Sequence, residues 1–231
     1  MIQLIKLEKM KLNTATYLYA SAGITGAAII VTLIVLFGGR YGGDADFKEI
    51  MSFSMLSKLA MTLQIAGYSL LGTAISARVI IDEYVSKRAS LLLTYPVNRK
   101  KLLTAKLIYA QGFMLFTMLV SLIVTQVVIM LFNLSIQAVV IDLTISRILV
   151  ILLVYFICAL LISGGMVMIS TMFGFMKKST IVSMVTNIII IACLGNVLMN
   201  DLGIYLAAFV LLVAANIAAF TLKQRVQHLE V

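Results

Sequence analysis

The sequence is poor in charge: Asp, Glu, Lys and Arg make up 12% of its 231 residues, whereas 62% are hydrophobic. A water-soluble domain usually has roughly 25% charged residues, which cover its surface. Half that share excludes a soluble globular protein, because so few charges cannot keep such a surface in water. The composition therefore predicts an integral membrane protein, with lipid as the solvent for much of its surface.

Residues that carry chemistry are equally scarce. The single histidine, His228, lies in the polar C-terminal tail, which excludes metalloprotease motifs and catalytic triads that require histidine. Cys158 and Cys193 both fall in apolar runs, so we interpret them as small buried hydrophobic residues rather than metal ligands. Neither a Walker A sequence nor a GxSxG elbow occurs. We predict that the chain is not an enzyme and has no cofactor or metal of its own.

What the sequence does contain is a series of six apolar runs. A span needs about 20 mostly apolar residues, and the expected spans cover residues 15–37, 56–81, 107–132, 148–175, 179–200 and 202–222. The second run is the most polar, because it contains Lys58, Gln64 and Arg78. Only Asp201 separates the last two runs, so we expect a very short turn there. The predicted fold class is an all-α membrane protein, with residues 1–231 forming one transmembrane domain.

The basic residues give the expected orientation. The segments on the N-terminal side of the membrane hold 14 of the 18 Lys and Arg residues, and cytoplasmic loops carry such an excess. We therefore place both termini in the cytoplasm of a multi-pass cell-membrane protein, with residues 1–14 as a basic interfacial segment and 223–231 as a cytoplasmic tail. The net charge of +9 follows this clustering, so it indicates lipid headgroups rather than nucleic acid as the partner.

The basic start followed by an apolar run imitates a secretory signal. The run at 15–37 is too long for a signal core, and no convincing small-x-small cleavage site follows it. We therefore expect a retained first helix. Six spans leave no room for a nucleotide-binding domain, so we expect any ATP hydrolysis to take place on a separate subunit.

Polar side chains inside the spans need partners, because hydrocarbon offers none. Two interpretations stay open at this stage. Such residues line a path for a transported molecule, or they form hydrogen bonds between helices or lie near the headgroups. The candidate pathway residues are Gln64, Gln111, Gln126, Asn187 and Asn196.

Small residues recur at helical spacing in the second span, at Ser69, Thr73 and Ala77. Such faces let helices approach closely. Contact with a second chain is one interpretation, and packing within the chain is another. For the Ser-Gly-Gly run at 163–165 in the fourth span, we favour close packing over a hinge.

The largest segment between spans covers residues 82–106, on the expected cytoplasmic side. Residues 83–93 contain no helix breaker, and their acidic start suits the positive end of a helix dipole. Pro96, the only proline in the chain, ends this helix, and Asn98 can cap a second helix that runs from Arg99 into the third span. The pattern predicts a short cytoplasmic helix, a rigid corner and a basic helix entering the membrane. A plain interfacial loop is the alternative.

This segment resembles the signature of type 2 ABC transporter permeases, in which an acid-led helix, a leucine pair, a proline, an arginine and a lysine follow the second span. The matching residues are Asp82, Glu83, Tyr84, Leu91, Leu92, Tyr95, Pro96, Val97, Asn98, Arg99, Lys100, Lys101 and Lys106. One departure is that Lys87 and Arg88 replace the Gly-Thr or Lys-Thr step that many relatives carry. The six-span arrangement with cytoplasmic ends is similar over the whole chain.

The resemblance implies that the segment is a coupling helix seated on a separate ABC ATPase, which binds ATP and magnesium. It also implies two ATPase copies and a second permease chain, as a homodimer or heterodimer. The residues it implies for the ATPase contact are Glu83, Tyr84, Leu91, Tyr95, Pro96 and Arg99.

The expected function is therefore the permease subunit of an ATP-driven exporter for an apolar or amphipathic compound, such as a peptide or antimicrobial. An ion-coupled secondary transporter or channel is the alternative. Such proteins bury ionisable residues near the membrane midplane, and the third to sixth runs contain none. An intramembrane enzyme would need spaced His, Glu or Ser and Lys groups within the spans, and these are missing.

Overall fold

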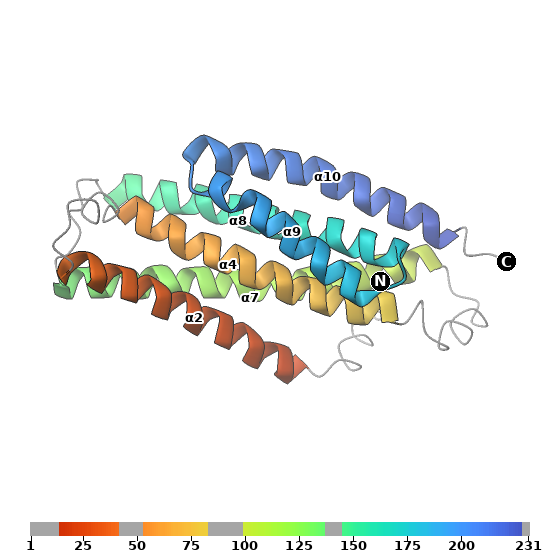
Figure 1. Cartoon of the computed structure of the whole chain (residues 1–231), viewed down its shortest axis with the longest axis horizontal. Coiled ribbons are helices and arrows are strands. Elements are labelled where there is room, and N and C mark those ends of the chain that lie inside the picture. Colours follow the sequence, from red (N-terminus) through yellow and green to blue (C-terminus); the bar gives the residue numbers. More distant parts are fainter. Residues whose placement is uncertain (1–13, 42–52, 83–98, 137–144, 228–231) are drawn as a thin grey trace.

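The computed structural model describes residues 14–41, 53–82, 99–136 and 145–227, which are helical almost throughout (Figure 1). The α-helices are α2 (Thr14–Tyr41), α4 (Phe53–Ser76), α7 (Arg99–Ile136), α8 (Ile145–Met176), α9 (Thr180–Leu198) and α10 (Asp201–Gln227). A five-residue π-helical segment, η1 (Ala77–Ile81), continues α4. The all-α prediction is confirmed for these ranges, in which no strand occurs.

Six membrane-crossing helices are present in the described ranges, with α4 and η1 together forming one span. This confirms the predicted number of spans, and the short turn between α9 and α10 is confirmed as well. The longest helix, α7, has 38 residues, or about 57 Å at 1.5 Å per residue. The hydrocarbon is only about 30 Å thick. Because α7 begins at Arg99, as predicted, its basic start can extend beyond the hydrocarbon.

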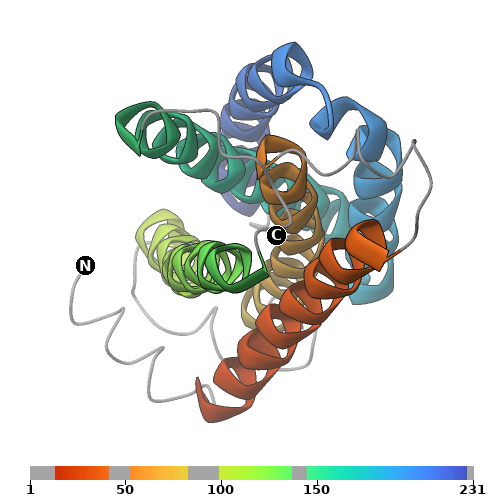
Figure 2. The ribbon, with the colours of Figure 1, turned by 90° about the vertical axis from the view of Figure 1, so that its left-hand side faces the viewer.

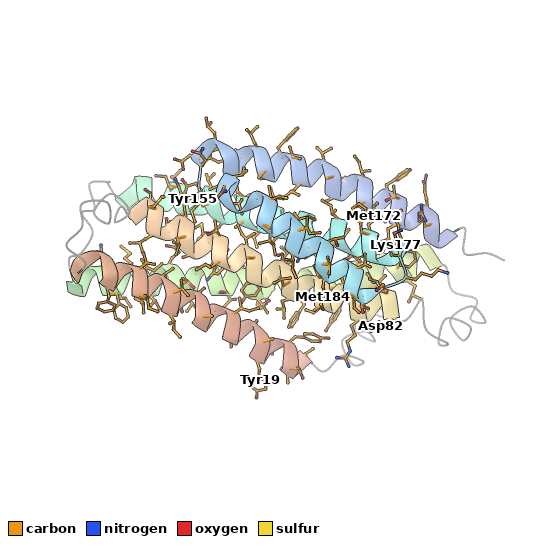
Figure 3. All side chains as sticks on the ribbon, in the orientation of Figure 1. Tyr19, Asp82, Tyr155, Met172, Lys177 and Met184 are labelled. Carbon is orange, nitrogen blue, oxygen red and sulfur yellow. The ribbon has the colours of Figure 1, made fainter. Side chains whose placement is uncertain are left out.

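The helices alternate in direction along one bundle (Figures 1 and 2). One end of the bundle holds the start of α4 and the α9–α10 turn, and the opposite end holds the end of η1, the start of α7 and the α8–α9 turn (Figure 1). We call these the α9–α10 end and the α8–α9 end. In Figure 3, Tyr155 lies toward the first, and Asp82 and Lys177 lie toward the second. This arrangement matches the two sides that the sequence predicted.

The central helix of the bundle is α4. In the apolar stretch of each span, 61% of the residues are buried in α4–η1, against 17–44% in the other five. It packs against α2, α7, α8 and α9, and Figure 2 shows it among them. The small residues Ser69, Thr73 and Ala77 are buried. This face therefore serves packing within the chain rather than contact with a second chain.

Two glycines explain close approaches between helices. A Cβ on Gly165 would lie 2.9 Å from the Leu211 Cβ and 3.0 Å from the Leu211 carbonyl oxygen, whereas one on Gly164 would meet nothing nearer than 3.7 Å. Gly165 thus lets the α8 and α10 backbones meet, so the run at 163–165 is a packing point, as favoured. A Cβ on Gly203 would lie 2.1 Å from the Val197 carbonyl oxygen. The α9–α10 turn therefore depends on this glycine.

The outward faces of several helices are apolar and exposed. Tyr19, Ile181 and Leu202 are 79%, 72% and 77% exposed, and Figure 3 shows Tyr19 pointing away from the bundle. Apolar surface of this extent suits hydrocarbon rather than water. Cys158 is buried, but Cys193 is exposed on α9, which corrects the expectation that both are buried. An apolar run predicts depth in the membrane, not which of its residues face lipid.

Candidate functional site

The polar interior of the bundle is organised by α4. Six polar residues of this helix are at most 1% exposed: Ser57, Gln64, Tyr68, Ser69, Thr73 and Ser76. Because α4 is surrounded by other helices, these side chains need partners on more than one side.

Hydrogen bonds connect α4 to α2 and α7. The Gln64 amide nitrogen Nε2 donates to the Ser121 carbonyl oxygen at 3.3 Å and to the Thr125 hydroxyl. The Thr25 hydroxyl oxygen lies 3.1 Å from the Tyr68 hydroxyl oxygen and 2.9 Å from the Ser121 hydroxyl oxygen. These contacts join three helices through neutral polar groups.

A second set of hydrogen bonds connects α4 to α8 and α9. The hydroxyl oxygens of Thr73 and Ser170 lie 3.1 Å apart. The Asn187 amide nitrogen Nδ2 donates to the Ser69 hydroxyl oxygen at 3.3 Å. Hydrogen bonding between helices, one of the two interpretations of the predicted polar residues, therefore applies to both Gln64 and Asn187.

Several buried polar atoms of this interior have no hydrogen-bond partner among the described residues. They are Gln64 Oε1, Gln111 Nε2, both amide atoms of Gln126, Ser183 Oγ and Asn187 Oδ1. Leaving such an atom unpaired costs about 1–3 kcal/mol, so a structure rarely keeps many of them. Water could supply the missing hydrogen bonds where a site is polar and roomy enough.

Four of the five predicted pathway residues belong to this set of unpaired atoms. Asn196 does not, because its side chain is exposed on α9. Asn216, a sixth amide in the spans, is likewise exposed on α10, where it donates to the Leu212 carbonyl oxygen of its own helix. Only the tertiary packing separates the buried amides from the exposed ones.

A charged cluster joins three helices at the α9–α10 end. Lys58 Nζ, near the start of α4, lies 2.6 Å from Asp201 Oδ1, at the start of α10. The Tyr155 hydroxyl of α8 donates to the same carboxylate oxygen. The Lys58 side chain is 9% exposed and that of Asp201 is 62% exposed. The carboxylate is thus the counter-charge of a nearly buried ammonium, at a helix N-terminus that favours an acid.

The sequence interpretation did not find this cluster, although part of the signal was present. Because successive spans alternate in direction, the six predicted runs put Lys58, near the start of the second, and Asp201, between the fifth and sixth, on the same side of the membrane. Tyr155 gave no signal, because a tyrosine inside an apolar run has many possible neighbours.

The α8–α9 end is built differently. There α4 changes from α-helix to the π-helical segment Ala77–Ile81, a distortion that is frequent at functional sites. Lys106 of α7, which is 1% exposed, donates from Nζ to the Val79 carbonyl oxygen at 3.2 Å. The turn into α9 passes through Lys178, whose φ is 52°. An ammonium group thus supports the distorted end of the central helix.

The predicted ATPase contact lies almost entirely outside the described residues. Glu83, Tyr84, Leu91, Tyr95 and Pro96 fall in the range 83–98, and of Arg99 only the backbone, at the start of α7, is described. The predicted coupling helix therefore stays a prediction.

Six membrane-crossing helices around a polar interior are what a transporter subunit requires. The model of the family described as "ABC-2 family transporter protein" matches residues 4–195. The chain belongs to the ABC-2 transporter family. Proteins of this family are membrane components of transporters, are not themselves catalytic, and normally work with an ATPase subunit. The resemblance to type 2 ABC permeases is confirmed at the level of the family.

One curated relative of this ABC-2 protein comes from Bacillus subtilis (strain 168). It is the uncharacterised protein YcbO, which is 30% identical over 123 residues. The match covers 52% of this chain and 51% of the relative, so the chain spans about half the length of the curated relative it matches. No solved structure matches the chain.

Proposed function

We propose that this ABC-2 protein is the permease subunit of an ATP-driven exporter in the cell membrane. Two copies of a separate ATPase would bind ATP and magnesium, and two permease chains, identical or different, would form the pathway. The cargo would be an apolar or amphipathic compound, such as a peptide or antimicrobial.

The position of α4 is the observation that carries this proposal. It packs against α2, α7, α8 and α9, and Lys58 connects it to α10 through Asp201. Its opposite end continues through η1 to Asp82, the first residue of the predicted coupling segment 82–106. A force applied to that segment would reach every other helix through α4, which is how packed rigid elements transmit coupling.

The proposal assigns a role to each predicted contact residue. Tyr84, Leu91 and Tyr95 would supply the apolar contact with the ATPase. Glu83 would hold the start of the coupling helix, and Pro96 would keep the corner at a set angle through its fixed φ. Arg99 would pair with an acidic residue of the partner or of its own chain.

Coupling is tested by Pro96→Ala in vesicles that contain the chain and its co-purified ATPase. We expect insertion and ATPase attachment to persist, because no span changes, while transport per ATP hydrolysed falls. Glu83→Ala and Arg99→Ala should act similarly and weaken ATPase attachment by about 1–3 kcal/mol if a buried charged hydrogen bond is lost. A matched control is Thr186→Val, because the Thr186 hydroxyl donates to the Ser183 carbonyl oxygen of its own helix. Unchanged coupling in all three variants would contradict the proposed lever.

The proposed orientation puts the α8–α9 end in the cytoplasm, because most basic residues belong to that side. Single cysteines at Asp44 and Arg99, in a chain without Cys158 and Cys193, test this with an impermeant thiol reagent on intact cells. We expect labelling at position 44 and none at position 99. The reverse result would invert the topology.

A further inference from the structure

A pocket lies between α2 and α7 on the side of the bundle. The two helices contact each other through Tyr17 and Phe113, whose ring centres are 6.5 Å apart, and through Phe37 and Phe132, at 6.4 Å. Figures 1 and 2 show α2 leaning away from α7 toward its N-terminal end. Along the helices between the aromatic pairs is a pocket with a volume of about 480 Å³. This is within the range of roughly 300–1,000 Å³ that small-molecule sites occupy.

One part of this α2–α7 pocket is polar. We call Ser21, Thr25, Tyr68 and Ser121 the hydroxyl cluster, and all four line the pocket. The Thr25 hydroxyl lies 2.8 Å from the Ser21 carbonyl oxygen and 2.9 Å from the Ser121 hydroxyl, and the Tyr68 hydroxyl donates to the same Ser21 carbonyl at 3.2 Å. Each hydroxyl oxygen has two acceptor lone pairs. The cluster is therefore held in place and retains capacity for a further hydrogen bond.

The rim of the pocket is apolar. Leu18 and Phe116 line it and are 51% and 69% exposed, so in a membrane they face hydrocarbon. None of the twelve described residues that line the pocket is charged. A charged group entering it would lose its hydration without gaining a counter-ion, which is expensive in a membrane. The pocket therefore selects for an uncharged polar group attached to an apolar body.

The space exists because α2 presents small side chains there. Ser21, Ala22, Thr25 and Gly26 of this helix line the pocket, and a Cβ built on Gly26 would meet nothing within 4 Å. A helical glycine costs about 1 kcal/mol relative to alanine, so its presence needs another reason. In the pocket, Gly26 leaves room that a larger side chain would fill.

The pocket is also continuous with the polar interior of the bundle. Ser121 accepts from Thr25 through its hydroxyl and from Gln64 Nε2 through its carbonyl oxygen. Gln64 is fully buried, and its Oε1 has no partner among the described residues. A polar group bound at the cluster would thus be separated from the Gln64 amide by Ser121 alone.

We propose that the α2–α7 pocket binds an uncharged amphiphile, with an alkyl chain along the apolar rim and a hydroxyl, ester or amide group on the hydroxyl cluster. The molecule enters sideways from the bilayer. Identifying it as the cargo rests on the proposed exporter function, whereas the binding itself does not.

The test uses the full chain in lipid vesicles without any ATPase, so that binding is measured independently of transport. The probe is a monoacylglycerol with a photoreactive diazirine on its acyl chain, and the charged comparison is lysophosphatidic acid with the same chain. We expect the monoacylglycerol to label peptides of α2 and α7 roughly tenfold more than the charged probe.

Two glycines of α2 provide matched variants. Gly26→Leu fills the pocket and should reduce labelling roughly tenfold. Gly23→Leu is the control, because Gly23 also has nothing within 4 Å of a built Cβ but does not line the pocket. Its labelling should stay within about twofold of the parent chain. Thr25→Val with Tyr68→Phe should reduce monoacylglycerol labelling roughly fivefold and leave a diazirine-labelled alkane unaffected.

Three results would overturn the proposal. The first is equal labelling by the neutral and charged probes. The second is undiminished labelling in Gly26→Leu. The third is a change in native mass in Gly26→Leu alone, which would make a second copy of the chain the occupant. If labelling fails, the coupling experiment with Pro96→Ala still tests the exporter function. If coupling fails, the labelling experiment still tests binding in the pocket, so the two proposals can be distinguished.

Discussion

The two ends of the bundle hold α4 by different means. At the α9–α10 end, Lys58 forms an ion pair with Asp201 of α10, and the Tyr155 hydroxyl of α8 donates a hydrogen bond to the same carboxylate. At the α8–α9 end, α4 loses its regular α-helical form in η1, where the Lys106 ammonium donates a hydrogen bond to the Val79 carbonyl oxygen.

The two ends therefore differ in how firmly they hold α4. The charged cluster fixes the position of α4 relative to α8 and α10, because a nearly buried ammonium is costly to separate from its counter-charge. The π-helical end is a local distortion of an α-helix, and the Lys106 ammonium holds it at the Val79 carbonyl oxygen. We therefore expect the α9–α10 end to contribute more to stability than the α8–α9 end.

The largest expected effect is that of Gly203→Ala at the α9–α10 turn. The new Cβ would lie 2.1 Å from the Val197 carbonyl oxygen, so the turn must open and displace Asp201. We expect a loss of about 3 kcal/mol, at the upper end for an overpacked site, seen as a lower unfolding temperature in detergent. Gly195→Ala is the control, because a Cβ there meets nothing within 4 Å. Equal stability of the two variants would contradict the role of this turn.

The next largest effect should come from Asp201→Asn, which leaves the Lys58 ammonium without its counter-charge. Because Asp201 is 62% exposed, we expect about 2 kcal/mol, less than the 3–5 kcal/mol of a fully buried pair. Lys58→Met should cost about 1 kcal/mol or less, because it removes the charge that needs a partner. Thermal unfolding of both variants measures which of them loses more stability. If Lys58→Met were the more damaging, the ion pair would not be the stabilising element.

An effect smaller than that of Asp201→Asn is expected at the α8–α9 end, from Lys106→Met. Loss of the ammonium–carbonyl hydrogen bond should cost about 1.5 kcal/mol and speed amide hydrogen exchange in Ala77–Ile81. Lys223→Met, a half-buried lysine at the same end of the bundle, serves as the control. If amide exchange in η1 is the same in the two variants, Lys106 does not stabilise the π-helical form of this segment.

The sequence predicted the membrane class, the six helices and the start of α7 because these depend on local information. Length and apolarity are read along one segment, and Pro96 and Asn98 lie just before Arg99 in the sequence, where they favour a helix start. Prediction was weaker for the polar residues, since Gln126 and Asn196 look alike in sequence, yet one is buried and the other is exposed. The position of an amide within an apolar run indicates its depth in the membrane. It does not indicate whether the amide lies on the face of the helix that packs against other helices.

By itself, then, the sequence determined that this protein crosses the membrane six times and that its charges divide between two sides, because hydropathy and charge clustering act segment by segment. Only the tertiary structure decided that α4 is the centre, that Lys58 meets Asp201, and that α2 and α7 enclose a hydroxyl-lined pocket. Each of these brings together residues from helices far apart in the chain. Their contacts depend on how helices rotate and approach, which no single segment specifies.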